Sequence, residues 1–329
     1  MNIDQKIYDF GLVKYALEHG GSIHPLIIPP EYTNGTGLMN PSILIHNNEI
    51  LVNIRHVNYT LYHSEGKTFQ HKYGPLQYLH PENDITLRTK NFICSLNNNY
   101  EVDKIYPVNT SKLDVDPLWE FIGLEDARLC YWDDKLYLSG VRRDTTTHGE
   151  GRMELSEVVR DGNEYKEISR ERIPAPGDNN SYCEKNWMPI LNNPFHYIKW
   201  TNPTEIAFYN KENKTTISEN KNHYMPCEYD FRGGSQIINI AGYNLAIIHD
   251  LNLFKSEQGN KDALYRHRFV VWDKDFNLLD FSDRFSFMDG DIEFSCGMAL
   301  QDRNLLITFG FQDNAAFLLK LPIETIGFY

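Results

Sequence analysis

The chain has 329 residues and a formal net charge of −13 at pH 7, with 41% hydrophobic and 23% charged residues. This composition is typical of a soluble globular protein, and the acidic balance argues against a nucleic-acid partner. The five cysteines are scattered without CxxC spacing, so we expect neither disulfides nor a zinc site. The sequence has neither an apolar signal core nor a run of about 18 apolar residues, so we expect a cytoplasmic protein without membrane contact.

A short helix is predicted over residues 4–19. Asp4 can act as its N-cap, and the Gly20-Gly21 pair stops it. The apolar positions of its pattern are Ile7, Phe10, Leu12, Val13 and Leu17. Beyond this segment, short apolar runs alternate with clusters of Asn, Asp, Gly and Pro, a pattern typical of an all-β protein. We therefore divide the chain into a helical lead-in at 1–34 and a β domain at 35–329.

Five segments of the β domain share one shape, in which an apolar strand is followed by a polar turn and a second apolar strand. They are PSILIHNNEILVNIR (41–55), DARLCYWDDKLYLSGVR (126–142), NWMPILNNPFHYIKW (186–200), SQIINIAGYNLAIIH (235–249) and CGMALQDRNLLITFG (296–310). Their turns contain Asn-Asn, Asp-Asp, Ala-Gly or Gln-Asp, which is the chemistry of β-hairpins. The repetition predicts five hairpins.

Five hairpins spaced about 50–90 residues apart, with further strands between them, predict a five-bladed β-propeller. In that fold the first strand of each blade lines a central channel, so polar residues at the strand starts would converge there. Such residues include Glu125, Asp126, Lys185 and Asn186. A pair of β-sandwiches or an irregular β domain is the alternative.

The stretch FIGLEDARLC (121–130) places two acids and an arginine within an apolar frame. Acidic side chains are seldom buried unless they are paired or used. Asp126 and Arg128 could form an ion pair at a strand edge, the commoner fate of this spacing. Alternatively, one carboxylate could act as an acid at a glycosidic oxygen while Arg128 holds its neighbour.

Cations recur at the ends of the second strands, at Arg55, at Arg142-Arg143 and at His249, and Lys185 opens the third hairpin. Such groups suit phosphate, although basic residues at strand ends are common. Adjacent strand residues face opposite sides, so the pattern leaves open whether Arg142 or Arg143 faces the channel.

Asp313 and Asn314 interrupt a very apolar strand pair, where they either cap a turn or bind sugar hydroxyls. The motifs of zinc proteases, serine hydrolases and nucleotide-binding loops are absent from the sequence. The pattern that remains is carboxylate chemistry on a sugar with cations nearby.

These motifs resemble those of glycoside hydrolase family 130, which contains β-mannoside phosphorylases and β-mannosidases. GLEDARL is similar to the family motif GxEDPR, with Ala127 in place of proline. The segments CEKNWMPI, GGSQIINIAGYNLAIIH, YRHRFVVWD and FSCGMALQDRNLLITFGFQDNAAF are similar to later family motifs in the same order. The resemblance covers residues 35–325 and implies a five-bladed propeller, and the insertion at 56–120 indicates a divergent branch.

The resemblance also implies roles for individual residues. Asp126 corresponds to the proton donor, which in the family acts through a sugar hydroxyl. Sugar-binding roles fall on Glu125, Arg128, Asn186, Asp313 and Asn314. A phosphate site is implied at Arg55, Arg143, Lys185 and His249. Inorganic phosphate would be a co-substrate, and no cofactor or metal is expected.

The expected activity is inverting phosphorolysis of a β-mannoside to mannose 1-phosphate, or the reverse transfer. Phosphate is already an anion at neutral pH and needs a cationic site rather than a general base, whereas a hydrolase needs a carboxylate to activate water. The alternatives are a β-mannosyltransferase that uses GDP-mannose, a β-mannoside hydrolase and a non-catalytic glycan-binding propeller. The expected partner is an oligosaccharide or sugar phosphate, and a homo-oligomer is compatible with the sequence.

Overall fold

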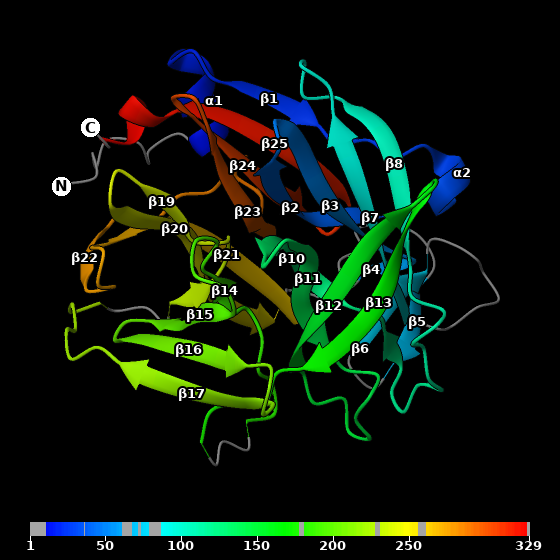
Figure 1. The fold of residues 1–329 in the computed structure, drawn as a ribbon. Helices are drawn as coiled ribbons and strands as arrows, with labels where there is room; N and C mark the ends of the chain where they lie inside the picture. The colour runs from blue at the N-terminus through cyan, green and yellow to red at the C-terminus, as the bar shows by residue number, and fades with distance from the viewer. Residues whose placement is uncertain are drawn as a thin grey trace.

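Strands make up most of the chain in the computed structural model, which describes residues 11–35, 37–60, 68–71, 74–78, 87–177, 181–227, 231–255 and 261–327. The helices of the described part are α1 (Leu12–Glu18), α2 (Pro30–Thr33) and a 3₁₀-helix (Ile323–Ile326). None of these helices is long and apolar enough to cross a membrane. The predicted all-β class is confirmed, and Figure 1 shows the sheets arranged about a common centre.

All five predicted hairpins are present as antiparallel strand pairs. They are β2 (Leu38–His46) with β3 (Glu49–Val57), β10 (Glu125–Trp132) with β11 (Lys135–Arg142), β14 (Met188–Pro189) with β15 (His196–Thr201), β19 (Ile238–Ile240) with β20 (Tyr243–Lys255), and β23 (Glu293–Gln301) with β24 (Asn304–Phe311). In the first turn, Asn47 and Asn48 have φ of 49° and 63°, and Asp133 and Asp134 of the second turn have φ of 48° and 59°. Two consecutive left-handed residues are the geometry of tight hairpins, and Asn and Asp tolerate it.

Each hairpin is extended by outer antiparallel strands. These are β7 (Leu87–Leu96) and β8 (Val102–Asn109), β12 (Arg152–Asp161) and β13 (Glu164–Arg172), β16 (Thr204–Asn210) and β17 (Thr215–Asn220), β21 (Lys261–Trp272) and β22 (Leu278–Phe281), and β25 (Ala315–Pro322) with β1 (Ser22–Pro25). Figure 1 shows β2, β10, β14 and β23 towards the middle, with β8, β17 and β22 at the periphery. A short parallel pairing of β13 with β8 joins two of these groups into one continuous sheet. The number of blades stays a prediction.

Short strands complete the sheets. β9 (Phe121–Ile122) pairs with β7, and β18 (Arg232–Gly233) pairs with β20. Within the 56–120 insertion, β4 (Tyr59–Thr60), β5 (Thr68–His71) and β6 (Gly74–Tyr78) form a separate small sheet. β1 comes from the segment assigned to the lead-in and pairs along β25, so the two ends of the chain share one sheet. The division at residue 34 stays a prediction.

The helix predicted over residues 4–19 is confirmed only in part, because α1 begins at Leu12, and Gly11 within the predicted range has a non-helical φ of 79°. α1 ends before Gly20 as expected, and its predicted start at Asp4 lies outside the described residues. Leu12 and Ala16 are fully buried in a core cluster with residues of β19–β21 and β23–β25. Leu17, predicted to share their apolar face, is 52% exposed because it lies at the edge of that buried stripe.

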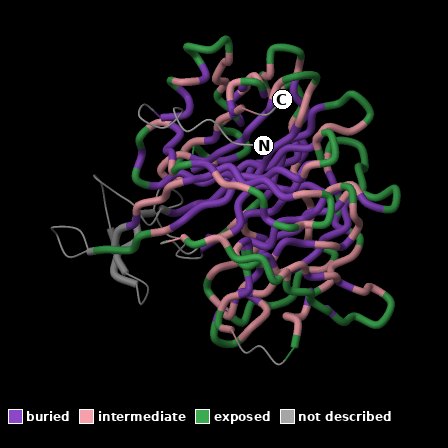
Figure 2. Tube along the Cα trace, turned by 90° about the vertical axis from the view of Figure 1, so that its left-hand side faces the viewer, coloured by how far each residue is buried: buried purple, intermediate pink, exposed green. Residues whose placement is uncertain are grey.

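Apolar side chains fill the space between neighbouring sheets, and Figure 2 shows buried residues along the strands with exposed residues concentrated in the outer loops. Trp132, Tyr137, Trp187 and Tyr197 form one such layer, with the Trp132 and Tyr197 rings edge to face at 5.7 Å. Burial of a large apolar side chain contributes roughly 1.5–3 kcal/mol to stability. These aromatic residues therefore build the core rather than a sugar-binding surface.

Buried polar side chains connect the first strands to one another at the centre. The Ser42 hydroxyl donates to the Ala127 carbonyl at 2.8 Å, and the Gln236 amide donates to the carbonyls of Ile43 and Leu129 at 2.8 and 3.0 Å. Because burial without a hydrogen bond would be costly, each bond fixes the relative position of two sheets. The centre of the fold is therefore rigid at the level where the predicted acids lie.

Candidate active site

The two acids of FIGLEDARLC lie at a β-bulge at the start of β10. The register between β10 and β11 shifts between Glu125 and Arg128, and Asp126 adopts a left-handed φ of 50°. Asn40 in β2 and Asn186 before β14 have similar values of 47° and 61°. A bulge re-aims a side chain out of the ladder, and Asn and Asp accept this backbone more readily than other non-glycine residues. Asn40 and Asp126 thus lie at corresponding register shifts of β2 and β10, and Asn186 before β14 shares their left-handed backbone.

The Asp126 carboxylate is buried and has two strong donors. Its Oδ1 accepts hydrogen bonds from Arg55 and from the Asn40 amide, each at 2.8 Å. Burial alone would raise the pKa of Asp126, but the positive charge of Arg55 and the Asn40 hydrogen bond outweigh it and lower that pKa to about 2. In the free protein at neutral pH, Asp126 is therefore ionised.

Two hydroxyl groups hold the Arg55 guanidinium in place next to the acids. Its guanidinium donates to the Thr89 hydroxyl at 3.2 and 3.3 Å and to the Tyr59 hydroxyl at 3.4 Å. Burial and the nearby acids raise the pKa of Tyr59, so this hydroxyl stays neutral. Arg55 is thus pre-oriented, with its charge directed at the two acids of β10.

Glu125 lies between two guanidinium groups. Its carboxylate oxygens are 3.8 Å from Arg55 and 3.7 Å from Arg143. Arg143 follows β11 and donates to the Gly149 carbonyl at 2.9 Å and to the Cys183 sulfur at 3.2 Å. Arg143, and not Arg142, is therefore the arginine that joins the acids, which answers the question that the sequence left open.

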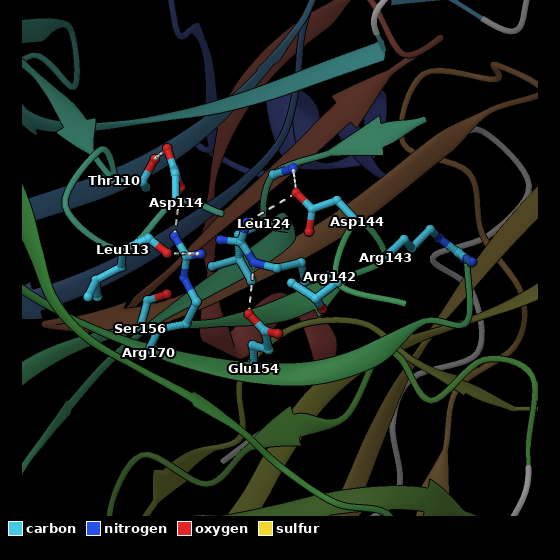
Figure 3. Close-up of polar contacts among 12 residues, drawn as sticks. Thr110, Leu113, Asp114, Leu124, Arg142, Arg143, Asp144, Glu154, Ser156 and Arg170 are labelled. Atoms are coloured by element: carbon cyan, nitrogen blue, oxygen red, sulfur yellow. Dashed lines mark hydrogen bonds and ion pairs between the residues drawn. The ribbon is translucent and has the colours of Figure 1, made fainter. Parts of the chain in front are cut away.

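Arg142 points the other way and belongs to a buried network between β10 and β12 (Figure 3). It donates to Glu154 at 2.7 Å and to Asp144 at 3.3 Å, and all three side chains are less than 8% exposed. Asp144 also accepts a hydrogen bond from the Gly123 N–H at 2.9 Å. A cavity of about 160 Å³ adjoins Arg142 on this side. The network fixes the backbone just before Glu125 and does not line the site of Asp126.

Arg128 also lies beneath the site, which corrects its predicted role in sugar binding. It is 1% exposed, and its guanidinium donates to the backbone carbonyls of Gly234 and Asp126 at 2.7–3.0 Å. The alternative prediction of an ion pair with Asp126 is also wrong, because the Asp126 carboxylate pairs with Arg55. Arg128 supports the backbone of the bulge.

The third hairpin brings Lys185 and Asn186 to the same region. Lys185 is exposed, and its positive charge acts on both Asp126 and Asp313. Asn186 is 7% exposed, and its side-chain oxygen has no hydrogen-bond partner among the described residues. Buried polar atoms are normally hydrogen-bonded, so this oxygen is suited to accept a bond from a ligand hydroxyl.

His249 lies within electrostatic reach of Lys185, and its predicted role in phosphate binding stays a prediction. It is 3% exposed and stacks on Tyr265 at a centroid distance of 5.5 Å. Burial, followed by the nearby positive charges, holds the pKa of His249 well below its ordinary value. A neutral imidazole can still donate one hydrogen bond to an oxyanion, but it adds no charge.

Asp313 and Asn314 lie in the turn between β24 and β25. Asp313 is half-buried and Asn314 is exposed. Burial raises the pKa of Asp313 to about 6, partly opposed by Arg55 and reinforced by the negative charge of Asp126. The pKa values of the two carboxyl groups are therefore shifted in opposite directions, so that Asp313 takes up a proton near pH 6 while Asp126 stays ionised there.

The structure thus brings together most of the predicted site residues from both ends of the sequence. These are Arg55, Glu125, Asp126, Arg143, Lys185, Asn186, His249 and Asp313. The sequence reasoning missed Asn40, Tyr59 and Tyr265. Asn40 precedes the first repeat at the position that Asp126 has in the second, which is the signal that could have found it. Within the described residues, no group of three His, Cys, Asp or Glu side chains could hold a metal ion.

No family model and no curated protein sequence matches this chain. Solved structures do match. β-1,2-Mannobiose phosphorylase from Listeria innocua, in complex with β-1,2-mannobiose, has a TM-score of 0.55 at 14% identity over 92% of this chain and 95% of the other. A structure from work on mannoside phosphorylases and hydrolases of glycoside hydrolase family 130, which target β-1,2-mannosidic linkages in Candida mannan, has a TM-score of 0.57 at 12% identity over 86% and 84% of the two chains.

This chain has the fold of the family 130 mannoside enzymes. The resemblance of the sequence motifs to that family is consistent with this fold. A GDP-Man-dependent mannosyltransferase from Leishmania mexicana is similar as well, with a TM-score of 0.50 at 10% identity over 92% of this chain and 90% of the other. The fold is therefore shared by proteins described as phosphorylases, hydrolases and a transferase.

Proposed function

We propose that this protein is a mannoside-active enzyme that catalyses inverting transfer of a mannosyl group between a β-mannoside and inorganic phosphate. The observation that carries the proposal is the buried Asp126 carboxylate, 2.8 Å from Arg55, with Arg143 paired to the adjacent Glu125 and the exposed Lys185 acting on Asp126. An acid next to several cations suits a reaction in which an oxyanion attacks while a leaving oxygen receives a proton. The fold shared with mannoside phosphorylases supports this assignment.

In the proposed reaction, a phosphate oxygen bonds to the anomeric carbon as the bond from that carbon to the leaving oxygen breaks on the opposite face. Asp126 supplies the proton to the leaving oxygen, directly or through a sugar hydroxyl, and monohydrogen phosphate brings the proton that balances the reaction. Asp126 is ionised in the free protein because of Arg55. An anion bound at Arg55 offsets that positive charge, so phosphate binding raises the pKa of Asp126 and allows it to carry the proton.

Asn186 and Asp313 are proposed to bind the sugar. The unpartnered oxygen of Asn186 can accept a hydrogen bond from a hydroxyl. Asp313 lies within electrostatic reach of Asp126 and Arg55 and can accept or donate according to its protonation. Asn314 is exposed and is proposed to contact the sugar from the rim of the site.

A second candidate is mannosyl transfer from GDP-mannose, favoured by the fold shared with the Leishmania mexicana mannosyltransferase. The same cations would then hold the diphosphate of the donor. The oligomeric state stays a prediction in either case.

The test is product formation from a set of small β-mannosides with inorganic phosphate. Release of mannose 1-phosphate by the wild-type protein but not by Asp126→Asn is the expected result. Release of free mannose without phosphate dependence would instead identify a hydrolase. Melting-temperature shifts with phosphate, mannose 1-phosphate, GDP-mannose and small mannosides complete the test, because a ligand that binds only the folded state raises the melting temperature. Stabilisation by GDP-mannose alone would identify the transferase, and mannoside binding without turnover a glycan-binding protein.

A further inference from the structure

Glu125 has an unusual set of contacts for a nearly buried acid. Its side chain is 13% exposed, and both carboxylate oxygens face guanidinium groups, Arg55 at 3.8 Å and Arg143 at 3.7 Å. These distances are those of ion pairs that are too long for direct hydrogen bonds. No hydrogen bond to the Glu125 carboxylate is formed by any residue in the described part of the chain. Buried carboxylates normally gain such bonds, which makes this arrangement loose.

The two arginines, in contrast, are firmly held by other partners. Arg55 is fixed by Asp126 and Thr89, and Arg143 by the Gly149 carbonyl and the Cys183 sulfur. Each guanidinium has five N–H donors, more than these contacts use. The pair therefore presents rigid spare donors towards a carboxylate that only partly satisfies them.

We propose that Glu125 competes with a bound oxyanion for the Arg55–Arg143 pair, and so limits the affinity of this site for phosphate and for the sugar phosphate product. The inference rests on the proposed function, because it assumes that the oxyanion site is the one used for phosphate. A fixed negative charge between two arginines lowers the free energy gained when a second anion binds there. It thereby favours product release, at the expense of ground-state affinity.

The charge balance of the site supports this role. Arg55, Arg143 and Lys185 are opposed by Glu125, Asp126 and Asp313. Of these acids, Asp126 is locked by two hydrogen bonds of 2.8 Å, whereas Glu125 is held only by the two long ion pairs. Glu125 is thus the acid that can move away when an oxyanion approaches.

The experiment measures the dissociation constants of inorganic phosphate and of sulfate, a non-nucleophilic oxyanion, by calorimetry. Glu125→Gln removes the charge while keeping the shape, and we expect at least about a tenfold tighter binding of both anions. The matched control is Glu219→Gln, which makes the same change of net charge at a side chain that is 68% exposed and forms an ion pair with Lys221. It should bind both anions as the wild type does.

Each outcome separates this inference from the proposed function. If the wild type binds phosphate and Glu125→Gln binds it equally or more weakly, the competition is refuted while the phosphorylase proposal stands. If neither protein binds phosphate or sulfate, both proposals fail. Glu125→Asp serves as a second variant if Glu125→Gln does not fold, since the shorter side chain withdraws the charge from the arginines. An intermediate gain in affinity is then expected, and no gain would overturn the inference.

Discussion

Replacing Asp313 with asparagine should stabilise the folded protein at neutral pH. Burial, with the negative charge of Asp126, raises the pKa of Asp313 from its ordinary value of 3.8 to about 6. The charged form is therefore disfavoured in the folded state. The resulting loss of folding stability is absent below the unfolded pKa and fully present above the folded pKa. A rise of this size corresponds to about 3 kcal/mol at pH 7.5, an upper limit because the side chain is only half-buried.

The pH dependence distinguishes this effect from a change in packing. The advantage of Asp313→Asn should decline as the pH falls and reach about a third of its neutral value near pH 4.5. Urea unfolding followed by tryptophan fluorescence at several pH values measures it, with an unchanged m-value as the condition for comparison. The reporter groups are the buried Trp132, Trp187 and Trp272.

In the same assay, Asp126→Asn should lower the free energy of unfolding, whereas Asp313→Asn should raise it. The pKa of Asp126 is lowered to about 2, so its carboxylate contributes stability above its unfolded pKa that is lost as the pH falls through about 2. At pH 7.5 this variant should lose about 2 kcal/mol. A variant of Asp313 that is no more stable than the wild type at pH 7.5, or whose advantage is the same at pH 4.5, would refute the electrostatic reasoning.

Three further predictions concern the bulge and its supports. Arg142→Met should destabilise the protein by about 3 kcal/mol in urea unfolding, because it removes the partner of Asp144 and leaves the buried Glu154 with Arg172 as its remaining ion-pair partner among the described residues; an unchanged unfolding midpoint would contradict the buried network. Asp126→Asn should lower kcat by about 10²–10⁴-fold while mannoside binding, followed by calorimetry, persists; full turnover would remove Asp126 from the chemistry. Gly123→Ala should lower the free energy of unfolding by about 1–3 kcal/mol in the same assay, because φ of Gly123 is 104° and a Cβ would lie 2.4 Å from the Thr89 carbonyl oxygen. An unchanged free energy of unfolding would show that the backbone before β10 adapts.

The strand pattern and the acids of the site could be predicted from the sequence because both depend on local chemistry. Alternating apolar residues and turns such as Asp133-Asp134 specify hairpins through the two-residue period of a strand and the left-handed tolerance of Asp. The same reasoning placed Glu125 and Asp126 at a strand start.

The partners of those acids were decided by the tertiary structure. Arg55 and Asn40 lie 71 and 86 residues from Asp126 in the chain, and they meet it only because the sheets surround one centre. The two-residue period shows that Arg142 and Arg143 face opposite sides, but not which of them faces the acids.

Charge states likewise depend on burial and on neighbours that the sequence does not place. Two aspartates with the same ordinary pKa differ because Asp126 accepts two strong hydrogen bonds, whereas burial dominates at Asp313. Burial similarly leaves His249 neutral. The sequence by itself determined which residue types meet at the strand ends, and the packing of the sheets decided which of them carry charge, because desolvation and ion pairing act over distances in space and not along the chain.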